Sequence, residues 1–294
     1  MKKKYFFYFF IFFLTLIIVF LFFQQRKNSL SQGLIFSYPD INTISFANEK
    51  VPMDEKHFYN KERFDKEYII TSTTLYQFYL YIKRYPLYIP FIEEKLKEKN
   101  MPLDLKYIPI AESALRNDIV SSVGAAGIWQ FMPETAKRFG LIVNENVDER
   151  YNFEKSTLSA LDYLQILYDK FGNWTLATAA YNRGENGLSK AMEKQGVKSY
   201  YDLYLNEETS RYIFRILAIK YLVENYFKQE KIVSTLIGGN YENPTTTTIK
   251  VKKIDDIGIW ATKNNQNYNT IKILNPWILG ETLPEGDWEV KILK

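Results

Sequence analysis

The residue best placed to perform chemistry is Glu112, which directly follows the apolar stretch YIPIA at residues 107–111. Burial among apolar neighbours removes water from a carboxylate and disfavours its charged form. The pKa of such a group could rise from about 4.3 to roughly 6, the range that a general acid needs near neutral pH. The same pattern also fits an ordinary glutamate on a helix surface, so the residues alone leave both interpretations open.

The rest of the residue inventory excludes several kinds of catalytic site. The 294-residue chain contains no cysteine, which excludes thiol nucleophiles, cysteine-ligated metals and disulfides. Its single histidine, His57, cannot provide a zinc site with two histidine ligands, and its polar surroundings argue against a Ser-His triad. The chain also lacks an S-x-x-K motif. Carboxylates, tyrosines and lysines remain, and no cofactor or metal is expected.

Charge and aromatic content bear on the partner. The net charge is only +4, and basic residues are interspersed with acidic ones, so the chain lacks the clustered basic face of a nucleic-acid-binding protein. The 23 tyrosines and 21 phenylalanines suit a groove in which ring faces stack on sugars. An aromatic-rich core explains them equally well.

The N-terminus has the pattern of a membrane anchor. Lys2, Lys3 and Lys4 precede an apolar run over residues 5–23, which as a helix would reach about 28 Å and so span a bilayer core of about 30 Å. The run lacks the small residues of a signal-peptide cleavage site, which favours an uncleaved anchor. The three lysines predict a cytoplasmic N-terminus with residues 24–294 outside the cytoplasm.

The remaining chain predicts a mainly α fold. Residues 24–50 are polar and mixed, as in a tether, and residues 51–230 carry apolar side chains at helical spacing. The expected helices include 64–84, 90–99, 103–114, a short one from Gly127 through Phe131, 133–139, 158–171, 174–181 and 212–226. Residues 245–251 and 288–292 are β-prone, which predicts a small α+β unit over roughly 245–294.

Three sequence blocks around Glu112 occur together: PLDLKYIPIAESAL at 102–115, SSVGAAGIWQFMPETA at 121–136 and AAYNRGENG at 179–187. In this order and spacing they resemble the lytic transglycosylases of bacterial peptidoglycan that have a goose-lysozyme-like SLT domain. Further similarities at 51–54, 148–157 and 208–218 extend the resemblance over roughly residues 51–225. It implies that residues 51–230 form a lysozyme-like all-α catalytic domain.

The resemblance assigns roles to individual residues. Glu112 matches the single catalytic acid/base of the family. Ser121 matches a serine that orients this glutamate or a substrate acetamido group, although a turn serine would look the same. Gln130 and Met132 match positions beside the cleaved bond, and Met132 could instead belong to the core. Tyr181 matches a tyrosine that contacts the site near the muramoyl sugar.

Two further positions complete the implied substrate-binding set. Asn182 follows the tyrosine in the motif, although an asparagine there could also cap the end of a helix before Gly184. Glu208 matches a second acidic position that lines the groove and is more often supportive than catalytic. Gly124 and Gly127 are expected to let the backbone pass close to the sugar.

The chemistry implied by the resemblance needs one carboxylate. Protonated Glu112 would donate its proton to the glycosidic oxygen between N-acetylmuramic acid and N-acetylglucosamine. The resulting carboxylate would take the proton of the muramoyl O6, which attacks C1 of the same sugar and gives a 1,6-anhydro product. An intramolecular nucleophile of this kind has a high effective concentration. Ordinary glycosidases use two carboxylates instead.

The C-terminal unit resembles a degenerate LysM module, a peptidoglycan-binding β-α-α-β fold. The pieces LNP at 274–276 and LPEG at 283–286 carry this resemblance. The usual G-D-T before the first helix is IDD at 254–256, so the unit could bind glycan or could serve only as a structural cap.

The sequence therefore predicts a membrane-anchored lytic transglycosylase of the bacterial envelope, with its catalytic domain on the periplasmic side. Its expected partners are peptidoglycan glycan strands and, through residues 1–23, the membrane, but not nucleic acid. A lysozyme-like hydrolase is one alternative, and Asp118 or Glu134 could then activate water. A non-catalytic peptidoglycan-binding protein is the other.

Overall fold

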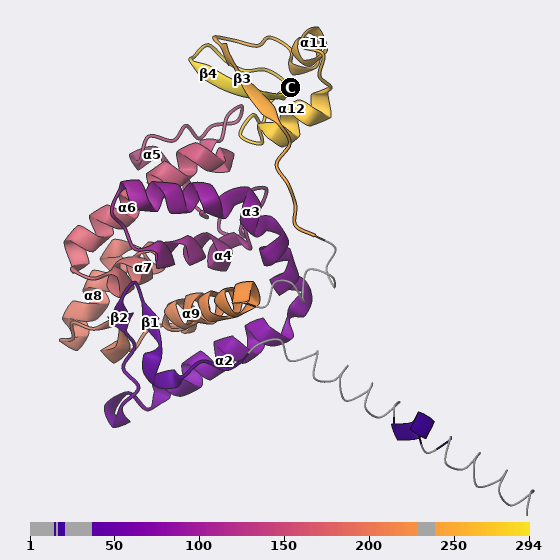
Figure 1. Cartoon of the computed structure of the whole chain (residues 1–294). Coiled ribbons are helices and arrows are strands. Elements are labelled where there is room, and N and C mark those ends of the chain that lie inside the picture. The colour runs from indigo at the N-terminus through magenta and orange to yellow at the C-terminus, as the bar shows by residue number, and fades with distance from the viewer. Residues whose placement is uncertain (1–14, 16, 21–36, 229–238) are drawn as a thin grey trace, which may run out of the picture.

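The computed structural model describes residues 15, 17–20, 37–228 and 239–294. It comprises a helical domain and a smaller C-terminal unit (Figure 1). Within these described ranges, no helix is long and apolar enough to cross a membrane. The anchor expected at residues 1–23 falls almost entirely outside the described residues and stays a prediction.

The helical domain consists mainly of α-helices joined by short 3₁₀ turns. Its helices are α2 (Tyr59–Thr73), α3 (Leu75–Glu98), α4 (Ile108–Ser113), α5 (Pro133–Arg138), α6 (Phe153–Phe171), α7 (Trp174–Arg183), α8 (Glu185–Gln195) and α9 (Glu207–Lys228). The 3₁₀ turns are η1 (Ile41–Thr43), η2 (Glu55–His57), η3 (Leu103–Tyr107), η4 (Glu149–Tyr151) and η5 (Tyr200–Asp202). The mainly α expectation is confirmed for this part of the chain.

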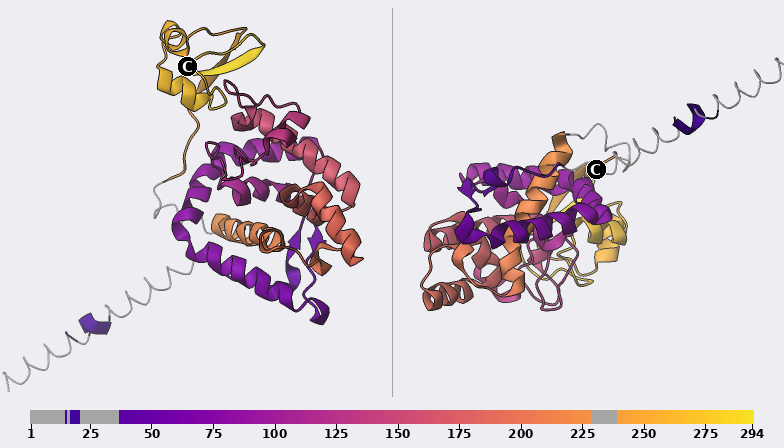
Figure 2. Two further views of the ribbon diagram at one scale, coloured as in Figure 1. Left: turned by 180° about the vertical axis from the view of Figure 1, so that it is seen from behind. Right: turned by 90° about the horizontal axis from the view of Figure 1, so that it is seen from below.

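Helix α9 runs through the middle of this domain, and α2, α4 and α7 pack against it. Figure 1 and the view from behind in Figure 2 show α3 curving over α4, so that α4 lies between α3 and α9. Two prolines inside α3, Pro86 and Pro90, suit such a bent helix, since each removes a backbone donor. This arrangement encloses the short helix that carries Glu112.

Local signals explain where the central helices begin and end. Asn152 caps α6 by accepting a hydrogen bond from the Lys155 amide at 3.1 Å, and Gly172 ends the helix in the left-handed conformation. Asn173 caps α7 in the same way through the Leu176 amide at 2.8 Å. The break between α6 and α7 thus follows from two adjacent residues, Gly172 and Asn173.

The segment just before residue 51 differs from the tether expected for residues 24–50. Strands β1 (Ser45–Phe46) and β2 (Glu49–Lys50) form a small antiparallel hairpin. Ile44 and Phe46 are completely buried in the main core. The Glu49 carboxylate accepts hydrogen bonds from the amides of Trp174 and Thr175 at the start of α7. Burial of Ile44 and Phe46 and this helix-capping carboxylate make the segment part of the domain.

The short helix expected from Gly127 is also absent. Residues 126–131 form a turn closed by an antiparallel bridge between Ala126 and Phe131. Gly127 and Gln130 have φ angles of 76° and 50°. These left-handed conformations are incompatible with a right-handed helix.

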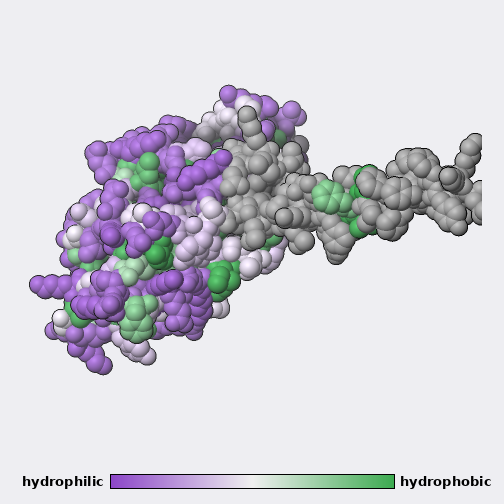
Figure 3. Space-filling view, turned by 60° about the horizontal axis from the view of Figure 1, so that its bottom comes forward, coloured by the Kyte–Doolittle hydropathy of each residue, from purple (hydrophilic) through white to green (hydrophobic). Residues whose placement is uncertain are grey.

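The C-terminal unit is a two-stranded antiparallel sheet with two short helices. Strands β3 (Thr246–Val251) and β4 (Trp288–Leu293) pair throughout, and α11 (Ile257–Lys263) and α12 (Tyr268–Leu274) connect them. The unit has its own small core, to which Val147 of the helical domain also contributes. The face in Figure 3 is mostly hydrophilic, and its hydrophobic residues form separate patches.

Candidate active site

Glu112 lies on α4, a helix of six residues that is held by its surroundings. Ala114 and Leu115 adopt left-handed conformations directly after the helix, with φ angles of 57° and 56°. The guanidinium group of Arg84 on α3 donates to the Ala114 carbonyl at 3.0 Å. The backbone around Glu112 is therefore fixed from both α3 and α9.

Glu112 has the electrostatic properties of a general acid. Loss of hydration is the main cause that raises the pKa of its carboxyl group, from 4.5 to about 7, and the negative charge of Glu208 raises it further. The Tyr212 hydroxyl donates a hydrogen bond to Glu112 Oε1. This bond and the positive charge of Arg215 stabilise the carboxylate and limit the rise. A group with a pKa near 7 can both give and take a proton at neutral pH.

Three of these groups come from one face of α9. Glu208, Tyr212 and Arg215 stand at positions i, i+4 and i+7, which brings them to the same side of a helix. The sequence assignment included Glu208 but missed Tyr212 and Arg215. Helical spacing from Glu208 was the signal that could have found both.

Arg215 also belongs to a second, ionic cluster. Glu67 on α2 is 1% exposed and pairs with Arg211 and, at 3.7 Å, with Arg215. A cavity of about 260 Å³ lies beside this cluster and is lined by Glu67, Arg211, Arg215 and Ala111, the residue before Glu112. The charge of Arg215 is thus shared between a buried structural carboxylate and the surroundings of Glu112.

Tyr181 and Asn182 bring the end of α7 to this site. The Tyr181 hydroxyl donates to the Trp129 carbonyl at 2.8 Å, and the charge of Glu112 helps burial to raise the pKa of this tyrosine. The Asn182 side chain donates to Glu208 Oε1 at 3.3 Å and accepts from the Thr209 hydroxyl at 3.1 Å. The structure therefore brings together three of the assigned residues, Glu112, Tyr181 and Glu208. Asn182, a fourth, holds Glu208 in place through the hydrogen bond to Oε1.

The loop of residues 119–132 holds the other assigned residues. The Ser121 hydroxyl accepts a hydrogen bond from the Ala125 amide at 3.0 Å and so stabilises its own turn. Gln130 donates to the Gly127 carbonyl at 2.8 Å within the same loop. Met132 is 43% exposed, so it is not a core residue.

A buried ion pair supports this loop, and the sequence assignment missed it. Arg150 pairs with Asp148, and the two residues are 7% and 4% exposed. Arg150 Nη1 donates to the carbonyls of Gly124 and Phe131, at 2.6 and 3.0 Å. A Cβ on Gly127 would lie 2.0 Å from the Arg150 carbonyl oxygen, so only glycine fits there. The DERYNFEKST block at 148–157 carries both partners of the ion pair, but no local pattern indicates that Arg150 reaches the carbonyls of Gly124 and Phe131.

The single histidine has structural partners. His57 Nδ1 lies 2.7 Å from Asp54, and Nε2 lies 3.1 Å from Asp202. Both partners are aspartates and neither is a serine, so His57 forms no Ser-His triad. Across the described part of the chain, no group of three or more His, Asp or Glu side chains could hold a metal ion.

Comparisons with known families match both units. Residues 89–203 match the family model described as the transglycosylase SLT domain. Residues 247–291 match the soluble lytic transglycosylase C-terminal LysM-like domain. The first match contains Glu112, Ser121, Gln130, Met132, Tyr181 and Asn182. Glu208 and the two α9 residues beside it lie just beyond the matched range.

Among characterised proteins, the chain is similar to membrane-bound lytic murein transglycosylase D of Escherichia coli. The identity is 36% over 143 residues, which covers 47% of this chain and 32% of that protein. The chain thus matches about a third of the length of its curated relative. The 70 kDa soluble lytic transglycosylase of Escherichia coli is 25% identical, over 52% of this chain and 26% of that structure, with a TM-score of 0.40.

Proposed function

We propose that this chain, which carries a transglycosylase SLT domain and a LysM-like C-terminal domain, is a peptidoglycan lytic transglycosylase. It cleaves the β-1,4 bond between N-acetylmuramic acid and N-acetylglucosamine and forms a 1,6-anhydro-N-acetylmuramic acid end. The observation that carries the proposal is the Glu112 carboxyl group, whose pKa of about 7 lets it act as acid and then as base.

In the proposed reaction, protonated Glu112 donates its proton to the glycosidic oxygen as the bond from that oxygen to C1 of the muramoyl sugar breaks. The neighbouring acetamido group stabilises the positive charge that develops at C1. The Glu112 carboxylate then takes the proton of the O6 hydroxyl while O6 bonds to C1. Glu112 ends protonated, as it began, so a single carboxyl group completes the cycle.

The other residues have positioning roles in this proposal. The Tyr212 hydroxyl orients the Glu112 carboxyl through the hydrogen bond to Oε1. Tyr181 and Ser121 hold the substrate acetamido group and the catalytic segment in register. The exposed Met132 and the neighbouring Gln130 lie beside the cleaved bond. Asn182 orients Glu208, whose charge helps to raise the pKa of Glu112.

The boundaries of the domains and the location of the protein are part of the same proposal. Residues 51–230, together with the packed segment at 44–50, form a lysozyme-like catalytic domain, and residues 245–294 form the LysM-like unit. Residues 1–23 anchor the protein in the membrane, so that the enzyme acts in the bacterial envelope. The apolar run of this chain supports that location, and so does its similarity to a transglycosylase whose name describes it as membrane-bound.

Mass spectrometry of digested peptidoglycan tests the function. Purified sacculi are incubated with the full-length protein, and the soluble fragments are analysed without chemical reduction. We expect fragments that end in 1,6-anhydro-N-acetylmuramic acid from the wild type and none from Glu112→Gln. A predominance of reducing ends would identify a lysozyme-like hydrolase, and no fragments from the folded wild type would identify a non-catalytic binding protein.

A further inference from the structure

The C-terminal unit is docked on the helical domain through backbone contacts. The amide of Asp148 donates to the Trp277 carbonyl at 2.9 Å, and the amide of Leu279 donates to the Asn146 carbonyl at 2.8 Å. Val147 and Ile278 form an antiparallel bridge between these bonds. Two hollows lie at this interface, and both are lined by Glu154 and Lys291, which form an ion pair.

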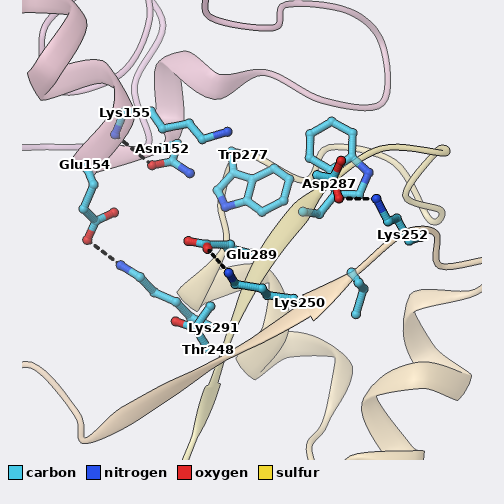
Figure 4. A pocket seen from close by; sticks show the side chains of 12 residues that line it. Asn152, Glu154, Lys155, Thr248, Lys250, Lys252, Trp277, Asp287, Glu289 and Lys291 are labelled. Atoms are coloured by element: carbon cyan, nitrogen blue, oxygen red, sulfur yellow. Dashed lines mark hydrogen bonds and ion pairs between the residues drawn. The ribbon is translucent and has the colours of Figure 1, made fainter.

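The first hollow, of about 570 Å³, is mainly ionic. Figure 4 shows Lys291 reaching Glu154, Lys250 reaching Glu289 and Lys252 reaching Asp287 around Trp277. Each of these lysines already has a carboxylate partner. A charged ligand would have to replace existing ion pairs, so this hollow gives no reason to expect one.

The second hollow, of about 810 Å³, is lined by aromatic, aliphatic and polar side chains. Phe153 contacts both Tyr88 and Phe91, with ring centroids 4.9 and 5.3 Å apart, and all three rings are only partly buried. Amide and carboxyl side chains complete the lining, among them Asn117, Asp118, Asn152, Asn243 and Glu289. The volume falls within the range of ligand pockets, about 300–1,000 Å³.

This second hollow, the interdomain cleft, begins close to the catalytic segment. Arg84 and Tyr88 stand one turn apart on α3. Arg84 donates to the carbonyl of Ala114, two residues after Glu112, and Tyr88 lines the cleft. The charges of Arg84 and Asp118 both act on the pKa of Tyr88, which burial raises, so the three groups are near neighbours. The cleft therefore lies on the α3 side of the segment that follows Glu112.

The lining indicates which class of ligand fits. Partly exposed rings beside amide and carboxyl groups suit a sugar, which has apolar ring faces and a periphery of hydroxyl and acetamido groups. An anion is disfavoured, because Lys272 donates to the carbonyls of residues 278–280 and Lys291 is paired with Glu154. We infer that the interdomain cleft binds an N-acetylhexosamine unit of the glycan strand, beyond the cleaved bond.

This inference rests on the proposed glycan substrate, and hydrogen–deuterium exchange tests it separately from catalysis. The full-length Glu112→Gln protein, which we expect to bind glycan without cleaving it, is titrated with N-acetylchitotetraose. We expect slower exchange at residues 243–248 and 272–277, the segments that line the cleft from the C-terminal side. Adding Tyr88→Ala should remove this protection or raise its titration midpoint by at least about five-fold.

Two control variants locate the effect. Tyr76→Ala removes an exposed tyrosine from the same helix, about 18 Å away along α3, and Tyr88→Phe keeps the ring; both should retain protection. Exchange without sugar shows whether each variant is folded, and Phe91→Ala replaces Tyr88→Ala if the latter is not.

Protection confined to residues 112–132, or cleft protection that survives the loss of Tyr88, would overturn the inference. If anhydro products form without cleft protection, only the cleft inference fails; if protection occurs without cleavage by the wild type, only the proposed function fails.

Discussion

Two carboxylates in the helical domain face the same helix, α9, and have opposite surroundings. Glu67 is buried against two guanidinium groups, those of Arg211 and Arg215. Glu112 receives a hydroxyl hydrogen bond from Tyr212 and feels Arg215 only as a more distant charge. Helix α9 thus supplies charged ion-pair partners to Glu67 and an uncharged hydroxyl partner to Glu112.

The difference separates a structural carboxylate from a reactive one. A buried carboxylate paired with arginines has its negative charge compensated and contributes to packing as long as both partners remain. A desolvated carboxyl group with a hydroxyl partner lacks a full counter-charge, so its protonated and ionised forms have similar free energies near pH 7. The two sites should therefore respond oppositely when each acid is replaced by its amide.

The largest expected effect is on catalysis at Glu112. Glu112→Gln keeps the size of the side chain but cannot give or take the proton, so we expect muropeptide release from sacculi to fall by roughly 10³-fold or more. Glu134→Gln, which changes an exposed carboxylate on α5, is the matched control and should keep nearly full activity. Near-normal release by the Glu112 variant would remove Glu112 from the mechanism.

The next effect is on stability at Glu67. Glu67→Gln leaves Arg211 and Arg215 without their buried partner, and we expect the free energy of unfolding at pH 7 to fall by about 3 kcal/mol. Chemical denaturation measures this change. Glu207→Gln removes an exposed partner of the same Arg211, at 3.1 Å, and should lower the free energy of unfolding far less, because solvent screens this pair. Equal losses in the two variants would show that burial does not distinguish these ion pairs.

The same comparison shows what the sequence could predict. The end of α6 and the start of α7 follow from Gly172 and Asn173, whose capping chemistry is local, whereas α6 begins at Phe153 after the Asn152 cap, ahead of the helix expected at 158–171. The position of Glu112 at the end of an apolar segment also indicated a carboxyl group with a raised pKa. These features depend on neighbours along the chain, and a sequence displays them directly.

Features that depend on distant partners were harder to predict. Glu67 and Arg211 are 144 positions apart, and nothing local to Glu67 announces the pairing. Arg150 supports the loop around Gln130 through backbone carbonyls, which have no signature in the sequence. The hairpin at 45–50 was missed because its two-residue strands are too short to show alternation.

An effect of comparable size, but of opposite sign, is expected on the stability of the Glu112 variant itself. The pKa of Glu112 rises from 4.5 to about 7, so the folded protein retains a proton that the unfolded chain loses between these values. The stability of the wild type must then fall as the pH rises through this window. Glu112→Gln removes this dependence on pH, so the variant should match the wild type at pH 4 and exceed it by about 3 kcal/mol at pH 8. Denaturation at both pH values measures the difference, and a variant that is less stable at pH 8 would contradict the raised pKa.

The smallest effects should appear in the pH dependence of kcat/KM, which reports the pKa of Glu112 in the free enzyme. Since Glu112 must begin protonated, activity should decline above pH 7. Tyr212→Phe removes a hydrogen bond that favours the carboxylate, so this decline should move to higher pH, by less than about one unit. Glu208→Gln removes a negative charge, so the decline should move by a smaller amount to lower pH.

Opposite shifts in these two variants would confirm that α9 sets the protonation of Glu112. Tyr221→Phe is the matched control, because its hydroxyl contacts Thr43 and Ser45 instead of Glu112, and it should leave the profile unchanged. Glu208→Gln also tests a hydrolase in which Glu208 takes the water-activating role that the sequence offered for Asp118 or Glu134. If Glu208 activated water, Glu208→Gln would lose activity at every pH. If Glu208 only repels the negative charge of Glu112, Glu208→Gln should shift the pH profile and leave the maximal rate nearly unchanged. A uniform loss in Glu208→Gln, with no shift in Tyr212→Phe, would replace the single-carboxylate mechanism by a two-carboxylate one.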